Sequence, residues 1–377
     1  MNRKNICEIC TLIMGQSPDS KSYNKDKNGI PFYQGNADFG EEHPTPTVWC
    51  TAPKKIARKG DILISVRAPI GDMNIANEDC CIGRGLAAIR LNKSDIVDIN
   101  YLYHYLSATV EFLQEQGTGS TFKAINKTTL EGIEIPCPSI EKQKNIAKLI
   151  IEIKTSIQYK KAELVALNEL VKSRFIEMFG DPLSNSKGYD LSDYGSLFEL
   201  NAGGTPSKNK PEYWENGNIS WIGSNMCQDT ILYENDGKYI TELGFNNSSA
   251  RMFPKNTVLV ALVGATIGKT ALLKFETTTN QNVLGIRGIE ESGNNPYFVF
   301  YYTQGLHKFF MDISDGGFAM ASKGFISKLP FPIVDISLQN EFATFVKQID
   351  KSKVDNQIYL INLCISNVLT EDLFSEQ

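Results

Sequence analysis

The chain has 377 residues, of which 42% are hydrophobic and 21% are charged, and its formal net charge is −5. This length suffices for two or three domains with their own cores. The charge excludes a uniformly basic surface, so any contact with nucleic acid depends on local patches or on a partner. The N-terminus lacks a signal-like apolar stretch and no apolar run reaches 18 residues, so we expect a cytoplasmic protein without a membrane span.

Two segments about 197 residues apart in the chain resemble each other. Residues 63–90 read LISVRAPIGDMNIANEDCCIGRGLAAIR, and residues 260–287 read VALVGATIGKTALLKFETTTNQNVLGIR. The two segments align without a gap and share Ile-Gly near the start and Ile-Arg at the end. A repeat with so long a period predicts two similar domains within one chain.

In chain order, each copy begins with short segments that are predicted to be strands, because they are apolar or β-branched and end at turn residues. These segments are residues 29–35, 60–66, 217–223 and 256–263. Aromatic runs follow at residues 101–106 and 297–302, and they predict buried amphipathic helices. Glycine-rich loops then cover residues 117–123 and 316–323, each ending in a lysine, where backbone can approach a ligand closely.

Each copy then reaches a proline pair and a long helix. Proline fixes φ and interrupts strands, so the pairs at residues 135–138 and 329–332 are predicted to mark the domain exits. The first helix is predicted to begin after Ser139 as N-cap and to stop at Gly180, which gives about 40 residues and roughly 60 Å. Its apolar residues recur at spacings of three and four; they include Ile146, Ile150, Ile153, Ile157, Leu164, Leu167, Val171 and Met178.

The second helix has a less regular apolar stripe with a polar break at residues 351–356. The stripe consists of Phe342, Phe345, Ile349, Ile358, Ile361, Ile365 and Leu369. Two long amphipathic helices in one chain can bury their stripes against each other, so we predict an intramolecular antiparallel coiled coil.

The predicted fold class is α+β, with two similar α/β domains separated by two long helices in a pseudo-twofold internal repeat. The predicted boundaries are 1–138 for the first domain, 139–187 for the central helical region, 188–332 for the second domain and 333–377 for the distal helical region. Their net charges are −1, +3, −3 and −4. Neither the first nor the second domain is therefore basic overall.

Three features resemble catalytic motifs, and each has a simpler interpretation. Gly264–Thr270 has three residues between its glycines where a phosphate-binding loop has four, so we predict a turn between strands. Residues 295–298 read Asn-Pro-Tyr-Phe, one proline short of an adenine-methyltransferase segment, and they begin the aromatic helix. The three histidines are isolated, and His104 is predicted to pack in a core.

Eight cysteines occur, but only Cys7 and Cys10 form a CxxC pair. A structural zinc site needs four ligands, so we expect buried reduced thiols rather than a metal site. No Ser/His/Asp set, paired carboxylates or cofactor loop is recognisable. The sequence predicts a binding protein that is not an enzyme and has no metal or cofactor of its own.

Several motifs together resemble the DNA-specificity subunit of Type I restriction-modification enzymes. The first copy carries GQSPDSKSYN at residues 15–24 and IPFYQGNAD at residues 30–38. The second carries GGTPSK at residues 203–208, Tyr213-Trp214 and ISWIG at residues 219–223. Both copies end in the proline pair, a glutamine and the long helix, so the resemblance covers essentially the whole chain.

The resemblance implies two target recognition domains, each reading one half of a split, asymmetric site in double-stranded DNA, with the helices fixing the unread spacing. It implies a non-catalytic chain that recruits two methyltransferase (modification) subunits and restriction/translocase subunits. S-adenosylmethionine, ATP and Mg are expected on those partners. Because the two domains differ in sequence, we expect two different half-sites.

Candidate DNA-binding residues follow from loop position and residue type, since Arg and Lys read guanine and Asn and Gln read adenine. In the first domain they are Gln16, Lys21, Tyr23, Gln34, Asn36, Arg67, Arg84 and Lys123. In the second domain they are Thr205, Ser207, Lys208, Tyr213, Trp221, Asn225, Lys269, Asn280, Gln281 and Lys323. For each residue the alternative is a solvated loop or a hydrogen bond that stabilises a turn, and Trp214 and Trp221 favour a core position over base stacking.

Partner binding is expected around the proline pairs, at Pro136, Pro138, Gln143, Pro330, Pro332 and Gln339. Two other functions fit the sequence. A coiled-coil scaffold would show no sequence-selective DNA binding. An autonomous methyltransferase or nuclease-associated protein of the same broader group would bind S-adenosylmethionine by itself, for which the chain shows no glycine-rich loop after a strand.

Overall fold

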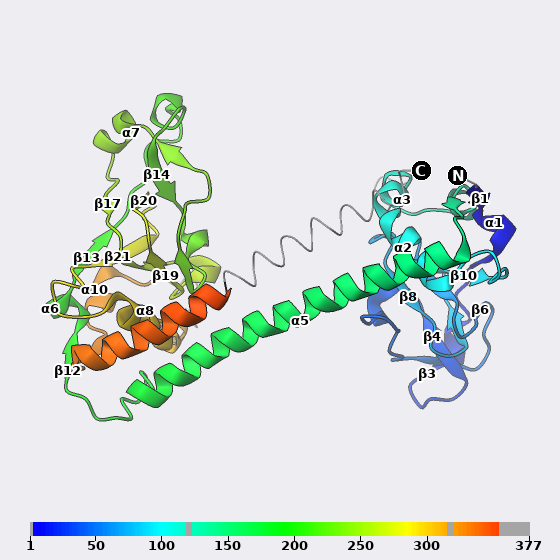
Figure 1. Ribbon diagram of the computed structural model, residues 1–377, viewed down its shortest axis with the longest axis horizontal. Helices are drawn as coiled ribbons and strands as arrows, with labels where there is room; N and C mark the ends of the chain where they lie inside the picture. The colour runs from blue at the N-terminus through cyan, green and yellow to red at the C-terminus, as the bar shows by residue number, and fades with distance from the viewer. Residues whose placement is uncertain (1–2, 118–122, 315–319, 354–377) are drawn as a thin grey trace. The chain divides into compact units, whose positions relative to one another are not determined.

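The structure, a computed structural model, describes residues 3–117, 123–314 and 320–353. Over these described residues, two compact units meet between Lys160 and Lys161, and they are drawn mainly in blue to cyan and in green to orange in Figure 1. Residues 118–122 and 316–319 of the predicted glycine-rich loops lie outside the described residues, as do Ile358, Ile361, Ile365 and Leu369 of the second predicted helix.

The described part of the first unit contains two main sheets and a short strand pair. In sheet order, the first sheet consists of β2 (Cys10–Met14), β10 (Leu86–Leu91), β7 (Ile62–Ser65) and β8 (Met73–Ile75). The second consists of β3 (Tyr23–Asn24), β5 (Trp49–Cys50), β4 (Ile30–Tyr33), β9 (Cys80–Ile82) and β6 (Ile56–Ala57). The pair is β1 (Arg3–Asn5) with β11 (Glu134–Pro136). Its helices are α1 (Ile6–Ile9), α2 (Ile99–Ala108), α3 (Val110–Glu115) and α4 (Lys127–Glu131), with 3-10 turns η1 (Ser20–Ser22) and η2 (Asn36–Asp38).

The second unit follows the same plan over its described residues. Its first sheet consists of β13 (Glu199–Ala202), β21 (Val283–Arg287), β18 (Val258–Ala261), β19 (Thr270–Leu273) and β15 (Thr230–Leu232). Its second consists of β16 (Tyr239–Ile240), β14 (Ile219–Ile222), β20 (Thr277–Thr279) and β17 (Met252–Phe253). The pair is β12 (Leu191–Asp193) with β22 (Pro330–Pro332). Its helices are α6 (Tyr194–Leu197), α7 (Glu242–Asn246), α8 (Pro296–Gly305), α9 (His307–Ser314) and α10 (Lys323–Ser327), with 3-10 turns η3 (Pro211–Tyr213), η4 (Ser224–Met226) and η5 (Gly264–Thr266).

The predicted repeat is therefore a repeat of topology. The sheet order β2-β10-β7-β8 in the first unit corresponds to β13-β21-β18-β19 in the second, and β15 extends the latter by one parallel strand. The predicted strands contain β4, β7, β14 and β18, and the predicted aromatic helices become α2 and α8. The phosphate-loop-like segment forms η5 between β18 and β19, the predicted turn between strands.

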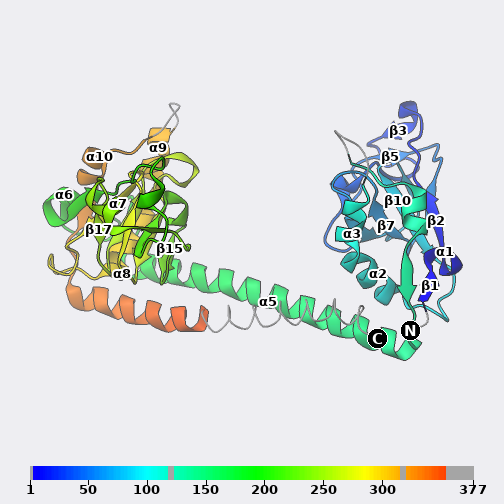
Figure 2. The same cartoon turned by 90° about the horizontal axis from the view of Figure 1, so that it is seen from above.

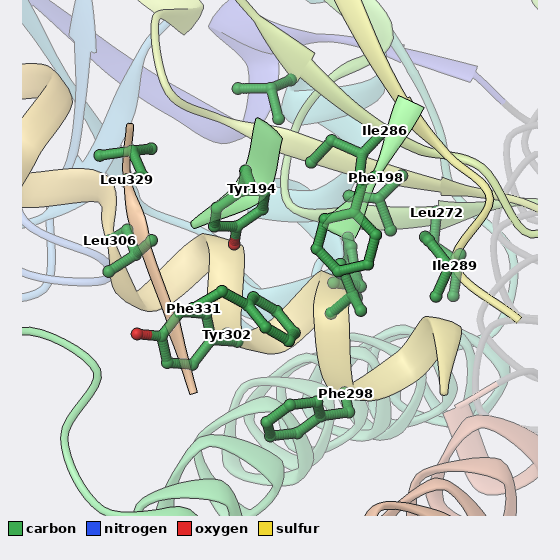
Figure 3. Close-up of a cluster of buried hydrophobic side chains, with 14 of the residues drawn as sticks. Tyr194, Phe198, Leu272, Ile286, Ile289, Phe298, Tyr302, Leu306, Leu329 and Phe331 are labelled. Carbon is green, nitrogen blue, oxygen red and sulfur yellow. The ribbon is translucent and has the colours of Figure 1, made fainter. Parts of the chain in front are cut away.

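Each first sheet is buried on both faces. In β7, Ile62 and Ile64 pack against the helices, while Leu63 packs towards the second sheet, because successive side chains of a strand point to opposite faces. The same alternation in β18 sends Val258 and Val260 towards the helices. Figure 3 shows the aromatic part of this second core, in which rings from α6, α8 and β22 meet. Each unit is thus layered as helices, sheet and second sheet.

Helix α5 (Ile140–Phe179) is the predicted 40-residue helix. The amide of Lys142 donates to the Ser139 hydroxyl at 3.4 Å, and Gly180 follows the last residue with a φ of 80°, a helix-terminating conformation that favours glycine. Its first turns, with Ile146 and Ile150, belong to the first core. Its last turns, with Val171, Phe175 and Phe179, belong to the second core.

Residues 336–353 form a second helix that runs beside the last turns of α5, as Figures 1 and 2 show in orange-red. The ring of Phe342 lies 5.3 Å from that of Phe175 and 5.5 Å from that of Phe179. Further along this helix, Asp350 and Lys353 line one pocket with the earlier α5 residues Leu164, Asn168 and Lys172. The two helices are therefore antiparallel over this stretch, and the predicted α+β class with paired long helices is confirmed.

The proline pairs differ from expectation. They were predicted to interrupt strands, yet Pro136 ends β11, and Pro330 and Pro332 are both in β22. Each of these strands belongs to a two-stranded sheet, where a proline without an N–H can face away from its partner. A helix nevertheless follows each pair, as predicted.

Gln143 and Gln339 are fully buried and make equivalent hydrogen bonds. Gln143 accepts from the amide of Asp98 at 2.9 Å and donates to the carbonyls of Ile96 and Pro138. Gln339 accepts from the amide of Asn295 at 2.8 Å and donates to Val334 O and Asn294 Oδ1. Each glutamine therefore ties the start of a long helix to the N-cap of the aromatic helix.

The remaining chemical predictions concern cysteine and histidine. The seven cysteines in the described residues are free thiols, and five are buried, whereas Cys7 is exposed. Burial raises the pKa of the Cys80 thiol to about 12, which makes it unreactive. Burial, together with the nearby Lys154 ammonium, lowers the pKa of His104 to about 4, so this core histidine is neutral at pH 7. Among the described residues there is no cluster of three metal-ligating side chains and no helix able to span a membrane.

We predict that Gln339→Leu destabilises the second unit by about 2 kcal/mol, because it leaves the partly buried amide of Asn295 and the buried carbonyl of Val334 without a partner. Gln348→Leu is the matched control, since Gln348 is exposed on the same helix. Urea denaturation of the full chain measures both, and amide hydrogen exchange at Asn295 should accelerate only in the first variant. Equal stability of the two variants would contradict the structural role of Gln339.

Candidate nucleic-acid interface

Most of the predicted DNA-binding residues gather at one edge of each second sheet. Strands β4 and β9 are parallel, with Tyr33 opposite Ile82, and strands β14 and β20 are parallel, with Ile222 opposite Thr279. The carboxyl ends of parallel strands meet at the same edge of a sheet. The loops that follow these strands therefore start side by side.

In the first unit a serine links three loops at this edge. The Ser17 hydroxyl donates to Gln34 Oε1 at 2.8 Å and accepts from the amide of Arg84 at 3.3 Å. The preceding amide, of Gln16, donates to the carbonyl of Ile82 at 3.0 Å. Gln16, Gln34 and Arg84 are all exposed, so their polar groups are available to a ligand.

Glycine makes this convergence possible. A Cβ at Gly15 would stand 2.1 Å from the carbonyl oxygen of Gly83, and a Cβ at Gly83 would stand 2.5 Å from Gln34 Oε1. Any larger residue at Gly15 would push the backbone segments apart, because a carbonyl oxygen of a paired strand end cannot move freely. The loop before Ser17 is thereby held against the end of β9.

We call this arrangement a frame: a glycine and a hydroxyl residue of one loop held against the loops that follow two parallel strands. The second unit builds the same frame. The amide of Gly204 donates to Thr279 O at 2.8 Å, and the amide of Asn280 donates to Ile222 O at 3.1 Å. A Cβ at Gly203 would stand 2.5 Å from the carbonyl oxygen of Asn280. The Thr205 hydroxyl donates to Gln281 Oε1 at 2.6 Å, so Thr205 occupies the place of Ser17.

One exchange distinguishes the two frames. In the first unit the carboxamide, Gln34, follows β4 and the glycine, Gly83, follows β9. In the second unit the glycine, Gly223, follows β14 and the carboxamide, Asn280, follows β20, with Asn280 Nδ2 at 3.6 Å from where a Gly223 Cβ would stand. Each frame therefore places one carboxamide beside one glycine, but on opposite strands.

Beside the second frame lies a pocket of about 550 Å³, and four of the predicted DNA-binding residues, Lys208, Trp221, Asn225 and Asn280, line it. The lining residues are Lys208, Pro211, Trp214, Glu215, Trp221, Gly223, Asn225, Lys238 and Asn280. The Trp221 indole donates to Gly204 O and the Trp214 indole donates to Ser207 O. Trp221 is 7% exposed, which fits the expected core position, whereas Trp214 is only half-buried and forms part of the pocket wall.

Three more candidates of the first unit lie next to its frame. Val66 N donates to Gly85 O, and Ala68 N donates to Lys123 O at 3.2 Å. Arg67, between them, and Lys123 are exposed. Asn36 follows Gln34 by two residues and donates to Asp72 Oδ2 at 2.5 Å. The local cations Arg67, Arg84 and Lys123 thus give this edge positive charge although the domain is not basic.

Five candidates lie elsewhere or are engaged in packing. Tyr23 stacks on Phe32 at 4.6 Å and lies in the edge strand β3, and exposed Lys21 lies in η1 just before it. Tyr213 is 6% exposed, and its hydroxyl accepts from Lys210. Lys269 donates to Gln228. Lys323 begins α10 and lines a different pocket.

The two lysines after the glycine-rich loops are not structural counterparts. The bridge from Arg67 to Ala124 corresponds to that from Val263 to Met320. Lys323 therefore corresponds to Lys127, the first residue of α4, and not to Lys123. Both lysines follow a glycine-rich loop in the sequence, but the bridge pairing shows that they stand at different positions of the two units.

Sequence reasoning omitted Ser17, which bridges Gln34 and Arg84. The signal was present, because GQSP at residues 15–18 and GGTP at residues 203–206 place a hydroxyl residue at the same position of each copy. No set of groups here suits acid–base or nucleophilic catalysis among the described residues. The arrangement offers hydrogen-bond donors, acceptors and fixed cations at an exposed edge, which suits recognition.

Comparison with known proteins decides the family. The model for the Type I restriction modification DNA specificity domain matches residues 1–169 and 186–361. The chain belongs to this family. Family members are the non-catalytic DNA-specificity subunits of Type I restriction-modification systems, so the predicted family, non-enzymatic character and role in DNA recognition are confirmed over the scaffold and autonomous-enzyme alternatives.

Individual relatives of this specificity-subunit family match different shares of the chain. The type I restriction enzyme MjaX specificity subunit of Methanocaldococcus jannaschii is 49% identical over 152 residues, 40% of this chain and 36% of that protein. The MjaIX specificity subunit of the same organism is 25% identical over 329 residues, 79% of this chain and 74% of that protein. The crystal structure of the Type-I restriction-modification S subunit from M. genitalium has the same fold, with 16% identity, a TM-score of 0.62, and coverage of 100% of this chain and 96% of that one.

We predict that Gly15→Ala destabilises the first unit by about 2 kcal/mol, because its Cβ would overlap the Gly83 carbonyl and force the backbone apart. Gly35→Ala is the matched control, since Gly35 has extended backbone and nothing within 4 Å of its Cβ position. Denaturant unfolding of both variants measures the difference. If Gly15→Ala is as stable as Gly35→Ala, the close approach of the loops does not exist in solution.

Proposed function

We propose that this chain sets the DNA sequence recognised by a Type I restriction-modification complex by reading a bipartite, asymmetric site. In this proposal residues 1–138 and 188–332 are the two target recognition domains, and each reads one half of the site in double-stranded DNA. Helix α5 and the helix of residues 336–353 are proposed as spacers that fix the distance between the half-sites, because two reading elements on one duplex need a constant separation.

One observation carries the proposal: a single chain builds the same strand-end frame twice and places different side chains on it. Ser17, Gln34 and Arg84 of the first frame become Thr205, Gly223 and Gln281 in the second. Because the two frames are alike, both domains can contact DNA in the same way. Because their polar side chains differ, the two domains are proposed to recognise different bases, since sequence is read by contacts to base edges. This combination favours an asymmetric target over a palindromic one.

The remaining candidates have distinct proposed roles. Lysines around the frames, such as Lys123 and Lys208, are proposed to contact phosphates, which position a protein without reading sequence. The chain's net charge of −5 supports tight binding only in a complex whose partners add positive charge. We propose two methyltransferase subunits, which carry S-adenosylmethionine, and restriction/translocase subunits, which use ATP and Mg, as these partners.

The modification subunits are proposed to dock at the segments around residues 136–143 and 330–339. The glutamines there are buried, so docking would use exposed neighbours, and in the second unit Ile333 and Ile336 are 53% and 43% exposed. Exposed large apolar side chains that lie close together are typical of protein-binding surfaces. Gln143 and Gln339 would then hold the docking segments in shape rather than touch the partner.

We predict that exchanging residues 188–332 for the matching segment of another family member changes one half of the methylated motif and leaves the other half unchanged. The measurement is sequencing of modified bases in a methylation-free host that expresses this chain with its cognate modification subunit. An unchanged motif, with both proteins soluble and co-purifying, would refute DNA reading by this segment.

We predict that the double substitution Ile333→Glu and Ile336→Glu weakens binding of the modification subunit at least tenfold, because it places two charges in an apolar interface. Leu243→Glu is the control, since Leu243 is 51% exposed but lies on α7. Affinity is measured by titration of the purified subunits. Equal affinities of the two variants and the natural chain would exclude this docking surface.

A further inference from the structure

Arg84 and Gln281 occupy the same position in the two frames. Continuing the register of Tyr33 with Ile82 and of Ile222 with Thr279 places each of them two residues beyond the last pair of parallel strands. The backbone hydrogen bonds agree, because Gly83 N donates to Tyr33 O and Asn280 N donates to Ile222 O. Arg84 is thus the direct counterpart of Gln281, although the two differ in charge and shape.

Both side chains are exposed, and a hydroxyl residue contacts each of the two positions. Arg84 and Gln281 are exposed, and the guanidinium of Arg84 has no hydrogen-bond partner among the described residues. A hydroxyl stands beside each: Ser17 accepts from the amide of Arg84, and Thr205 donates to Gln281 Oε1. In the first unit the contact holds the backbone from which Arg84 starts, and in the second it orients the Gln281 carboxamide.

The neighbouring carboxamides are already engaged within the frame. Gln34 Oε1 accepts from Ser17, and Asn280 Oδ1 accepts from the amide of Asn282 at 3.1 Å. Each also lies against a glycine, where its position is set by packing. Gln34 and Asn280 are also not at matching positions, whereas Arg84 and Gln281 are exposed and equivalent in register.

The chemistry of the two side chains selects different bases. A guanidinium donates two parallel hydrogen bonds to O6 and N7 of guanine, and a carboxamide both accepts from N6 and donates to N7 of adenine. Gln281 Oε1 keeps a second lone pair after accepting from Thr205, so it can still accept from adenine. The frame therefore carries a guanine reader in one unit and an adenine reader in the other.

We propose that Arg84 and Gln281 are equivalent specificity-determining residues, which select guanine in the first half-site and adenine at the corresponding position of the second. The proposal rests on the proposed function of the chain as a reader of two half-sites. It goes further in naming one residue and one base for each half.

The test uses reciprocal substitutions in the full chain, co-expressed with its modification subunit in a methylation-free host. Arg84→Gln should shift one position of the first half-site from guanine to adenine, and Gln281→Arg should shift one position of the second from adenine to guanine. The preference at that position should change by roughly tenfold or more, the usual value of a bidentate base contact, while every other position stays the same. Sequencing of modified bases across the genome gives the motif of each variant.

Two further variants separate base reading from charge. Arg84→Lys keeps the charge but loses the planar fork, so guanine preference should fall, whereas a phosphate contact would tolerate lysine. Arg58→Gln is the control for charge loss, because Arg58 is exposed beyond the opposite end of β9, and its motif should match that of the natural chain.

Two results would overturn the assignment. One is a motif that stays unchanged in Arg84→Gln and Gln281→Arg. The other is a uniform loss of methylation at all sites, with Arg84→Lys behaving as the natural chain, which would make Arg84 a phosphate contact. Failure of the proposed function looks different, since exchanging residues 188–332 would then leave the whole motif unaltered.

Discussion

The close approach of backbone at the carboxyl ends of the parallel strand pairs is the constraint on which the candidate interface depends. Gly15 and Gly203 stand where any side chain would strike a carbonyl oxygen of the adjoining strand end. Because these loops meet without side chains between them, one hydroxyl residue can contact two neighbouring loops. Ser17 contacts Gln34 and Arg84 in this way, and Thr205 contacts Gln281 in the second unit.

This arrangement separates stability from recognition. The first sheet of each unit is buried on both faces. The fully buried side chains of Gln143 and Gln339 tie the long helices to the aromatic helices through hydrogen bonds. Substitution there leaves cavities or unpaired polar groups, which is costly. Arg84 and Gln281 are exposed, and exposed substitutions usually change stability little. A chain built this way can change the bases it reads without changing its fold.

Charge follows the same division. The chain as a whole is acidic, with a net charge of −5, yet Arg67, Arg84 and Lys123 collect beside one frame, and Lys208 and Lys238 line the pocket beside the other. Local cations of this kind can orient a phosphate backbone without making the chain a general nucleic-acid binder. Sequence selectivity then depends on the few groups with two hydrogen-bonding positions in fixed geometry.

The sequence by itself determined the features that depend on neighbouring residues. The repeat, the α+β class, the forty residues of α5 and its end at Gly180 follow from local periodicity, capping and glycine geometry, and the strands around β7 and β18 follow from β-branched runs. Family membership also follows, because the motifs occur twice in the same order.

Tertiary structure decided what depends on partners distant in the chain. The parallel pairing of β4 with β9, the exchange of Gln34 and Gly83 for Gly223 and Asn280, and the correspondence of Lys323 with Lys127 all rest on hydrogen bonds or register between distant segments. Prolines of both pairs lie in strands, which is possible because β11 and β22 each pair with only one other strand. Local propensity cannot encode such pairings, since their energy exists only once the chain has brought the segments together.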